Sequence, residues 1–205
     1  MSGARPTILD LGVGNLGNVE RALRVLGAAP RVTGDPAEVA AARVLVLPGV
    51  GAFRPPRERL RGELEAALRE ALDAGAWLLG ICVGFQLLFE ASEEDGITDG
   101  LGLLPGRVVR LPDTVPVPHI GWNRLRPVVP EHPLLAALPA DASVYFVHSF
   151  APVEVDGVAL AEAEHGVRFA AVAGRERIVG TQFHPEKSGA VGLRLLASFL
   201  EIADA

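Results

Sequence analysis

The first half of the chain alternates short apolar runs with helical segments, and this alternation restricts the fold more than any other feature of the sequence. Residues 43–47 and 75–81 are almost purely apolar, as in strands of a parallel sheet that is covered on both faces. Between them, residues 57–72 repeat leucine and alanine along one helix face. The sequence therefore predicts an α/β fold with an open, mostly parallel sheet flanked by helices.

The second half of the chain has a different pattern. Short strand candidates separated by proline and glycine turns indicate antiparallel hairpins, at residues 106–111, 124–129, 143–150, 157–163, 167–173 and 177–183. Residues 189–202 then have the apolar spacing of a closing helix. No linker, repeat or low-complexity tract divides the sequence, so we expect residues 1–205 to form a single domain with an antiparallel extension.

Charge and cysteine content exclude several classes of protein. The net charge of −6 argues against binding to nucleic acid or to an anionic membrane surface. A single cysteine rules out an internal disulfide and favours a reducing compartment, so we expect a cytoplasmic protein. The longest uncharged stretch, residues 74–89, is 16 residues long and falls short of the ~20 that a membrane helix needs.

Rare residue types gather in a few short stretches of the chain. The sequence has three asparagines and two glutamines, and these residues together with the lone cysteine and the lone lysine fall within residues 12–18, 82–86, 121–123 and 182–187. Because alanine, leucine, glycine, valine, proline and arginine dominate elsewhere, this clustering points to chemistry, although chance could also produce it.

One of these stretches resembles a dinucleotide-binding turn. Residues 12–17 read Gly-Val-Gly-Asn-Leu-Gly, follow a predicted strand and open a predicted helix, and Asp35 lies about 20 residues on, as the ribose-binding acid of such a site would. Asp35, however, belongs to an Asp-Pro turn after an unusually short strand. We therefore favour a simple glycine turn that leaves Asn15 and Asn18 free for another role.

The lone cysteine lies in a turn typical of catalytic nucleophiles. Cys82 separates a predicted strand from a predicted helix over residues 84–90, within the pattern Gly-x-Cys-x-Gly of residues 80–84. Such a turn exposes the side chain at the carboxyl edge of the sheet, and the following helix favours the thiolate form. The Val83 N–H would then face a developing oxyanion. A buried structural cysteine is the competing interpretation.

A cysteine nucleophile needs a base, and His184 is the strongest of five candidates. It follows a predicted strand and precedes Pro185-Glu186, so Glu186 can accept the imidazole N–H. His132 and His165 are expected in solvated loops, His119 beside a proline-rich stretch and His148 within a strand. The glycine-rich turn of residues 48–51 ends a neighbouring strand and could supply a second oxyanion donor. A polar turn and a plain strand exit remain the alternatives.

Taken together, these motifs resemble the class I (triad) glutamine amidotransferases. The resemblance rests on Pro48-Gly49-Val50-Gly51, Gly80-Ile81-Cys82-Val83-Gly84-Phe85-Gln86 and His184-Pro185-Glu186, whose order and spacing cover nearly the whole chain. Within the family, the chain is similar to the glutaminase subunits of imidazole glycerol phosphate synthases. That similarity rests on residues 10–16, 118–123 and 145–149 and on the extension to Lys187-Ser188.

The resemblance implies a glutaminase that needs neither a metal nor a cofactor. It implies that Cys82 attacks the side-chain amide of L-glutamine, that His184 moves protons and that Glu186 holds His184. The oxyanion donors would be Val83 and the Val50–Gly51 segment. Glutamine contacts map onto Gly51, Gln86, Glu94 and the backbone of Ser149 and Phe150. The chain departs from the family at Val83 and Phe85, where Leu and Met are usual, and at Phe150, where Tyr is common.

The resemblance also implies a partner, because ammonia released alone would be lost to solvent. The family partner is a cyclase subunit with a (β/α)8 barrel that receives the ammonia internally, giving a heterodimer that makes imidazole glycerol phosphate and AICAR in histidine biosynthesis. Asn15, Trp122 and Asn123 are the candidate contacts. Alternatives are a glutaminase for another synthase, such as those for anthranilate or pyridoxal phosphate, and an inactive interaction module. The intact set of Cys82, His184 and Glu186 argues against the inactive module.

Overall fold

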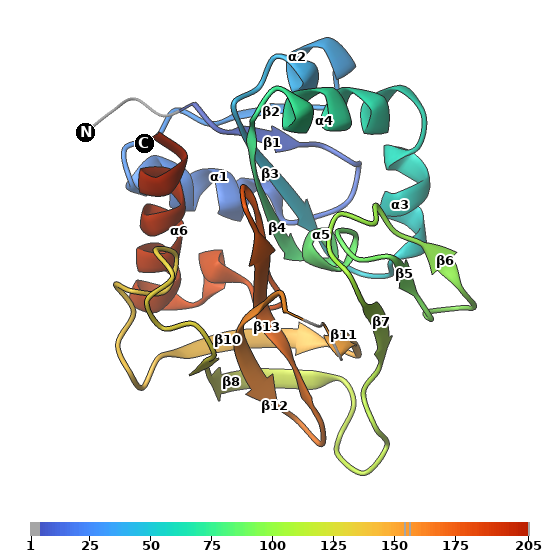
Figure 1. Ribbon diagram of the computed structural model, residues 1–205, viewed down its shortest axis with the longest axis vertical. Helices are drawn as coiled ribbons and strands as arrows, with labels where there is room; N and C mark the ends of the chain where they lie inside the picture. The colour runs from blue at the N-terminus through green and yellow to red at the C-terminus, as the bar shows by residue number, and fades with distance from the viewer. Residues whose placement is uncertain (1–4, 154, 156, 205) are drawn as a thin grey trace.

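The computed structural model describes residues 5–153, 155 and 157–204, and its centre is a large mixed sheet with helices on both faces (Figure 1). Within the described residues this sheet has eight strands in the order β2-β1-β3-β4-β14-β13-β12-β9. Its parallel part is formed by β1 (Thr7–Leu9), β2 (Arg31–Thr33), β3 (Val44–Gly49), β4 (Trp77–Cys82) and β14 (Ile178–Thr181). The predicted fold class is confirmed.

The apolar runs are explained by burial on both faces of this sheet. Val44 and Val46 pack in one hydrophobic cluster, together with side chains of α1 (Leu16–Val25) and α6 (Gly189–Asp204). Leu45 and Leu47 point to the opposite face and pack with α2 (Pro36–Ala40), α3 (Arg54–Leu60) and α4 (Glu63–Asp73). Since successive strand residues face opposite sides, a strand covered twice must be apolar throughout.

The helix predicted over residues 57–72 is wrong in one respect, because the structure has two helices there. The first, α3, ends at Leu60 and the second, α4, begins at Glu63. Between them Gly62 has φ +84°, a backbone conformation that favours glycine. The leucine and alanine spacing continues across this break, so the periodicity did not reveal it.

The antiparallel part joins the main sheet through β13 (Arg168–Arg175), which pairs with β14 and with β12 (Ala159–Glu164). The other strands outside the parallel part are β5 (Ala91–Ser92), β6 (Thr98–Asp99), β7 (Arg107–Arg110), β8 (His119–Arg124), β9 (Arg126–Pro127), β10 (Ser143–His148) and β11 (Phe150–Val153). The strand predicted over residues 124–129 contains only the two-residue β9, and the longer strand β8 before it was not predicted.

The strand predicted over residues 143–150 is two strands in different sheets. The first, β10, pairs with β8, whereas β11 pairs with β7 in a separate small sheet (Figure 1). The chain changes sheets at Ser149. This change places Ser149 and Phe150 beside the carboxyl edge of the parallel strands. None of the helices in the described part of the chain has the length and apolar character needed to cross a membrane.

Candidate active site

Cys82 lies at the sharp turn between β4 and the short helix α5 (Val83–Gln86). Its φ is +55°, a conformation that residues other than glycine rarely adopt. A Cβ at Gly80 would lie 2.7 Å from the Phe85 Cα, and one at Gly84 would overlap the Leu47 carbonyl. Both glycines are thus required for close packing, as the elbow pattern predicted. The helix expected over residues 84–90 is present but shorter, since α5 ends at Gln86.

The loop after β3 lies against this turn. Strands β3 and β4 are parallel neighbours, and their register places Gly49 opposite Cys82. A Cβ at Gly49 would lie 2.7 Å from the Gly84 nitrogen, so the two loops touch through their backbones. Val50, Gly51 and Val83, the predicted oxyanion residues, line one cavity together with Cys82.

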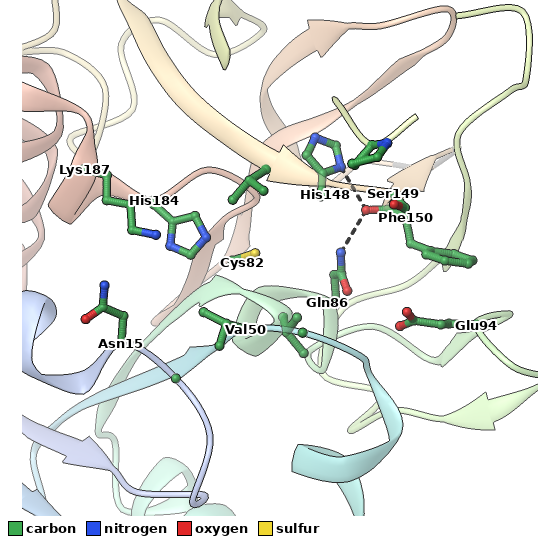
Figure 2. A pocket seen from close by; sticks show the side chains of 15 residues that line it. Asn15, Val50, Cys82, Gln86, Glu94, His148, Ser149, Phe150, His184 and Lys187 are labelled. Carbon is green, nitrogen blue, oxygen red and sulfur yellow. Dashed lines mark hydrogen bonds between the residues drawn. The ribbon is translucent and has the colours of Figure 1, made fainter. Parts of the chain in front are cut away.

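His184 reaches the same edge of the sheet because β14 runs parallel to β4. The His184 ring lies beside the Cys82 sulfur (Figure 2) and is only 2% exposed. Its Nδ1 lies 2.8 Å from the Oε1 of Glu186, which belongs to the short 3-10 helix η1 (Pro185–Lys187). A carboxylate only accepts, so Nδ1–H donates and Nε2 remains available to a second partner.

The surroundings of His184 favour its charged form. Burial lowers the pKa of His184, but the hydrogen bonds and the negative charge of Cys82 and Glu186 outweigh it and raise the pKa to about 9. The side chain of Glu186 is only 1% exposed, so its charge is poorly screened by solvent. Its Oε2 has no hydrogen-bond partner among the described residues. The arrangement thus pairs a sulfur with an imidazolium that a buried carboxylate orients.

A cavity of about 590 Å3 opens at Cys82 and collects the predicted glutamine contacts (Figure 2). Its walls include Gly51, Gln86, Glu94, Ser149 and Phe150. Glu94 lies at the end away from His184, where its carboxylate accepts the Phe53 N–H at 2.7 Å. Burial raises the pKa of Glu94; the Phe53 hydrogen bond opposes this rise and the charge of Asp95 adds to it. One carboxylate in a mostly uncharged wall suits a ligand that carries an ammonium group.

The Phe150 carbonyl is already occupied by protein donors. Gln86 Nε2 donates to it at 2.8 Å, and His148 Nδ1 donates to it at 2.9 Å. A carbonyl oxygen has two lone pairs, so both are used. The Ser149 carbonyl accepts the Leu111 N–H at 2.9 Å. The predicted substrate contact at Ser149 and Phe150 would therefore use a backbone N–H rather than the Phe150 carbonyl.

The predicted partner contacts do not all lie together. Asn15 lines the cavity, but Trp122 and Asn123 lie outside it on β8. Trp122 is 60% exposed, and Ile120, two residues earlier, is 61% exposed on the same face of the strand. Asn123 is turned inward, and its Nδ2 donates to the Glu164 carbonyl at 2.9 Å. Trp122 and Ile120 therefore form the exposed apolar surface of β8, whereas the Asn123 amide is occupied within the chain.

Gln182 received no role from the sequence, whereas His148 was one of the five candidate bases. His148 lines the cavity wall, and Gln182 is fully buried with its Nε2 4.0 Å from the Cys82 sulfur. The signal for Gln182 was present, because it is one of only two glutamines and lies in a stretch of rare residue types. His165 was expected in solvent, but its ring stacks on His119 with centroids 4.2 Å apart.

The dinucleotide interpretation is wrong. Asp35 caps α2, where its side chain accepts the N–H groups of Ala37 at 2.8 Å and Glu38 at 3.4 Å. Gly14 and Asn15, from the glycine-rich turn, line the Cys82 cavity instead. Within the described ranges no cluster of three or more histidine, cysteine, aspartate or glutamate side chains is arranged to hold a metal ion.

Comparison with known proteins agrees with this geometry. The sequence matches the family described as glutamine amidotransferase class-I over residues 7–202. Proteins named imidazole glycerol phosphate synthase subunit HisH are similar to it throughout. That of Geobacillus kaustophilus is 50% identical, with 96% of each chain covered. That of Symbiobacterium thermophilum is 49% identical, with 96% of this chain and 93% of the relative covered. That of Methanosarcina barkeri is 43% identical, with 97% of this chain and 98% of the relative covered.

Solved structures share the fold at lower sequence identity. A structure described as PurLQS from Thermotoga maritima has a TM-score of 0.80 at 20% identity and covers 98% of this chain and 99% of its own. A structure described as a glutamine amidotransferase has a TM-score of 0.75 at 21% identity. It covers 98% of this chain and 99% of its own.

Proposed function

This chain belongs to the class I glutamine amidotransferases, and from this premise we propose that it is the glutaminase subunit of an imidazole glycerol phosphate synthase. We further propose that residues 1–205 act as one amidotransferase domain. The observation that carries the proposal is the arrangement of Cys82 and His184 at one cavity, with Glu186 bound to His184 at 2.8 Å. The names of relatives at 43–50% identity support the choice of synthase.

The first half-reaction releases ammonia. The Cys82 thiolate attacks the side-chain carbonyl carbon of glutamine, and the carbonyl oxygen becomes an oxyanion that backbone N–H groups of Val83 and the Val50–Gly51 segment stabilise. His184 gives its Nε2 proton to the amide nitrogen as the carbon–nitrogen bond breaks. The products are ammonia and a γ-glutamyl thioester on Cys82. Glu186 keeps the His184 ring in the tautomer and orientation that this transfer needs.

The second half-reaction restores the enzyme. His184, now neutral, takes a proton from a water molecule that attacks the thioester carbon. The carbon–sulfur bond breaks, glutamate leaves and Cys82 returns as a thiolate beside protonated His184. No cofactor enters either half-reaction, since only proton transfers and acyl transfer occur. Glu94 supports recognition of the amino-acid end of glutamine, because it lies in the cavity wall away from His184.

We propose that the ammonia passes to a cyclase subunit with a (β/α)8 barrel. Free ammonia would be protonated in solvent and lost to the synthase reaction. The exposed apolar surface formed by Ile120 and Trp122 on β8 supports this docking, because aromatic side chains anchor many interfaces. Asn15 also supports the docking proposal, because it lines the cavity at Cys82 from which the ammonia would leave. Asn123 would contribute by holding β8 rather than by direct contact, since its amide is bonded to Glu164.

The proposal is tested by Cys82→Ala in the complex with the cyclase. Because Cys82 serves only the ammonia-releasing half-reaction, glutamine hydrolysis should be abolished while the complex still makes product from ammonium salts. Glutamate release and imidazole glycerol phosphate formation are measured separately. Residual glutamine hydrolysis near the wild-type rate would rule out Cys82 as the nucleophile.

A further inference from the structure

Gln182 is a buried polar side chain that the mechanism above leaves unused. It follows β14, two residues before His184, and is 0% exposed. Its Nε2 lies 4.0 Å from the Cys82 sulfur, within the range of a hydrogen bond to sulfur, and its Oε1 lies 3.1 Å from Gln86 Nε2. One amide thus contacts both the sulfur that is attacking and a predicted glutamine contact.

The orientation of the Gln182 amide follows from its neighbours. The Phe150 carbonyl can only accept, so Gln86 must present its Nε2 to it, at 2.8 Å. The second hydrogen of the same nitrogen then faces Gln182, which must present Oε1 to it. Gln182 Nε2 is therefore left facing Cys82. The flipped amide would set two NH2 groups against each other and an oxygen against the sulfur, so it is disfavoured at both ends.

The Phe150 carbonyl that orients Gln86 also accepts a hydrogen bond from His148, which is in turn bonded to His119. His148 Nδ1 donates to the carbonyl, and His148 Nε2 lies 3.0 Å from His119 Nδ1. Burial lowers the pKa of His148 to about 3, so the ring is neutral and its Nε2 accepts from His119. Donors from His148 and from Gln86 therefore converge on the Phe150 carbonyl, and the histidines that fix this carbonyl belong to β10 and β8.

We propose that Gln182 is a further catalytic residue, whose amide N–H donates to the Cys82 sulfur and stabilises the thiolate, with Gln86 as the positioning residue that holds it in this orientation. This role rests on the proposed function, because it requires Cys82 to be the nucleophile. A buried N–H without a partner is costly, and the sulfur is the partner that Gln182 Nε2 has in the structure.

The contact would act at the two points where Cys82 carries negative charge. Before attack it stabilises the thiolate against recapture of the His184 proton. When the thioester breaks, the carbon–sulfur electron pair returns to sulfur, and the same N–H stabilises the departing thiolate. The donor gives up no proton in either step, so the proton balance between His184, ammonia and water is unchanged.

The test measures ionisation of Cys82 directly in the full-length protein. Cys82 is the single cysteine, so the pH dependence of its alkylation by iodoacetamide reports this thiol alone. Gln182→Met keeps the length of the side chain and removes the donor, and Gln182→Glu keeps an oxygen for Gln86 but places an oxygen against the sulfur. In both variants we expect the midpoint of alkylation to rise by about one pH unit, which corresponds to a tenfold smaller acid dissociation constant of the Cys82 thiol.

Thr181→Val is the matched control. Thr181 is also 0% exposed, precedes Gln182 and loses a buried hydrogen bond to the Phe183 carbonyl at 2.9 Å, but it is not bonded to Cys82. Its alkylation midpoint should stay at the wild-type value. The proposal is overturned if folded Gln182 variants keep that value, or if Thr181→Val raises the midpoint as much. Circular dichroism establishes folding.

A third variant keeps the test decisive if neither Gln182 variant folds. Gln86→Met removes the group that orients Gln182, so the alkylation midpoint should again rise, and an unchanged midpoint would overturn the proposal. Alkylation requires neither glutamine nor a partner. A wild-type protein that fails to hydrolyse glutamine with its cyclase would refute the proposed function, whereas the alkylation profile refutes or supports the role of Gln182 alone.

Discussion

The His184 ring interacts with two neighbours, Glu186 and Cys82, which affect it in different ways. Glu186 accepts a hydrogen bond from Nδ1–H at 2.8 Å and thereby fixes the orientation of the imidazole. Cys82 interacts with the same ring and favours a second proton on it, so that the pKa of His184 rises to about 9 although burial acts in the opposite direction. The proton that ammonia departure requires is therefore present at neutral pH.

The two residues should differ in their importance for rate. His184→Ala removes the proton-transfer group itself, so we expect glutamine hydrolysis in the cyclase complex to fall by ~10²–10⁴-fold or more. Glu186→Ala leaves the imidazole in place without its orienting partner, so the loss should be smaller. Steady-state glutamate release measures both. A greater loss in Glu186→Ala would mean that the two roles are assigned incorrectly.

A substitution at His148 provides the control for the variants of His184 and Glu186. Its Nδ1 holds the Phe150 carbonyl rather than the reacting sulfur, so His148→Asn should raise KM for glutamine more than it lowers kcat. A fall in kcat as large as that of His184→Ala would contradict this distinction between binding and chemistry.

At the scale of elements, the nucleophile turn depends on how closely two loops approach. The register that sets Gly49 opposite Cys82 brings the end of β3 into backbone contact with the start of α5. Gly84 packs against the Leu47 carbonyl, and Gly180 on β14 packs against the Phe85 ring. Side chains at these positions would separate the strands that hold Cys82, Val50 and His184 at one edge.

Gly84→Ala should therefore destabilise the protein. Its Cβ would overlap the Leu47 carbonyl, a backbone atom that cannot move aside cheaply, so we expect the free energy of unfolding to fall by at least about 1–3 kcal/mol. Denaturant unfolding measures this change. Gly17→Ala is the control, because Gly17 lies in α1 with open space around it, and alanine there should stabilise by about 0.5–1 kcal/mol. Unchanged stability of Gly84→Ala would contradict the close contact.

For the molecule as a whole, the site should be regulated by its partner. A glutaminase that worked constantly would release ammonia with no acceptor. The loop after β3 suits a switch, because Gly51 has φ +83° and a peptide flip beside glycine meets little steric resistance. We expect the resting loop to withhold an oxyanion donor and the docked cyclase with its bound nucleotide to favour the active orientation.

The isolated chain should then hydrolyse glutamine very slowly. One missing oxyanion donor is worth ~10²–10³-fold in rate, so the complex with liganded cyclase should be faster by at least ~10²-fold. Glutamate release is measured for the chain alone, with cyclase, and with cyclase and its nucleotide. Trp122→Ala should raise the cyclase concentration needed for activation. Full activity of the chain alone would refute the switch and favour an independent glutamine hydrolase.

Features that depend on short-range patterns could be predicted from the order of the amino acids. The apolar runs predicted the doubly covered parallel strands β3 and β4, because a strand buried on both faces has no polar positions. The Gly-x-Cys-x-Gly pattern predicted the strained turn at Cys82, and the tripeptide His184-Pro185-Glu186 predicted a contact between residues two positions apart. Each of these features depends on residues that are close in the sequence, so local patterns were sufficient to predict it.

Contacts between distant segments could not be predicted in this way and are seen only in the folded chain. The pair Gln86–Gln182 is 96 residues apart in sequence, and the change of sheets at Ser149 depends on which strand each segment finds as a partner. The break at Gly62 also went unseen, because leucine spacing continues through it. Side-chain type and periodicity record which residues are buried, whereas the choice of partner depends on how all strands and helices pack at once.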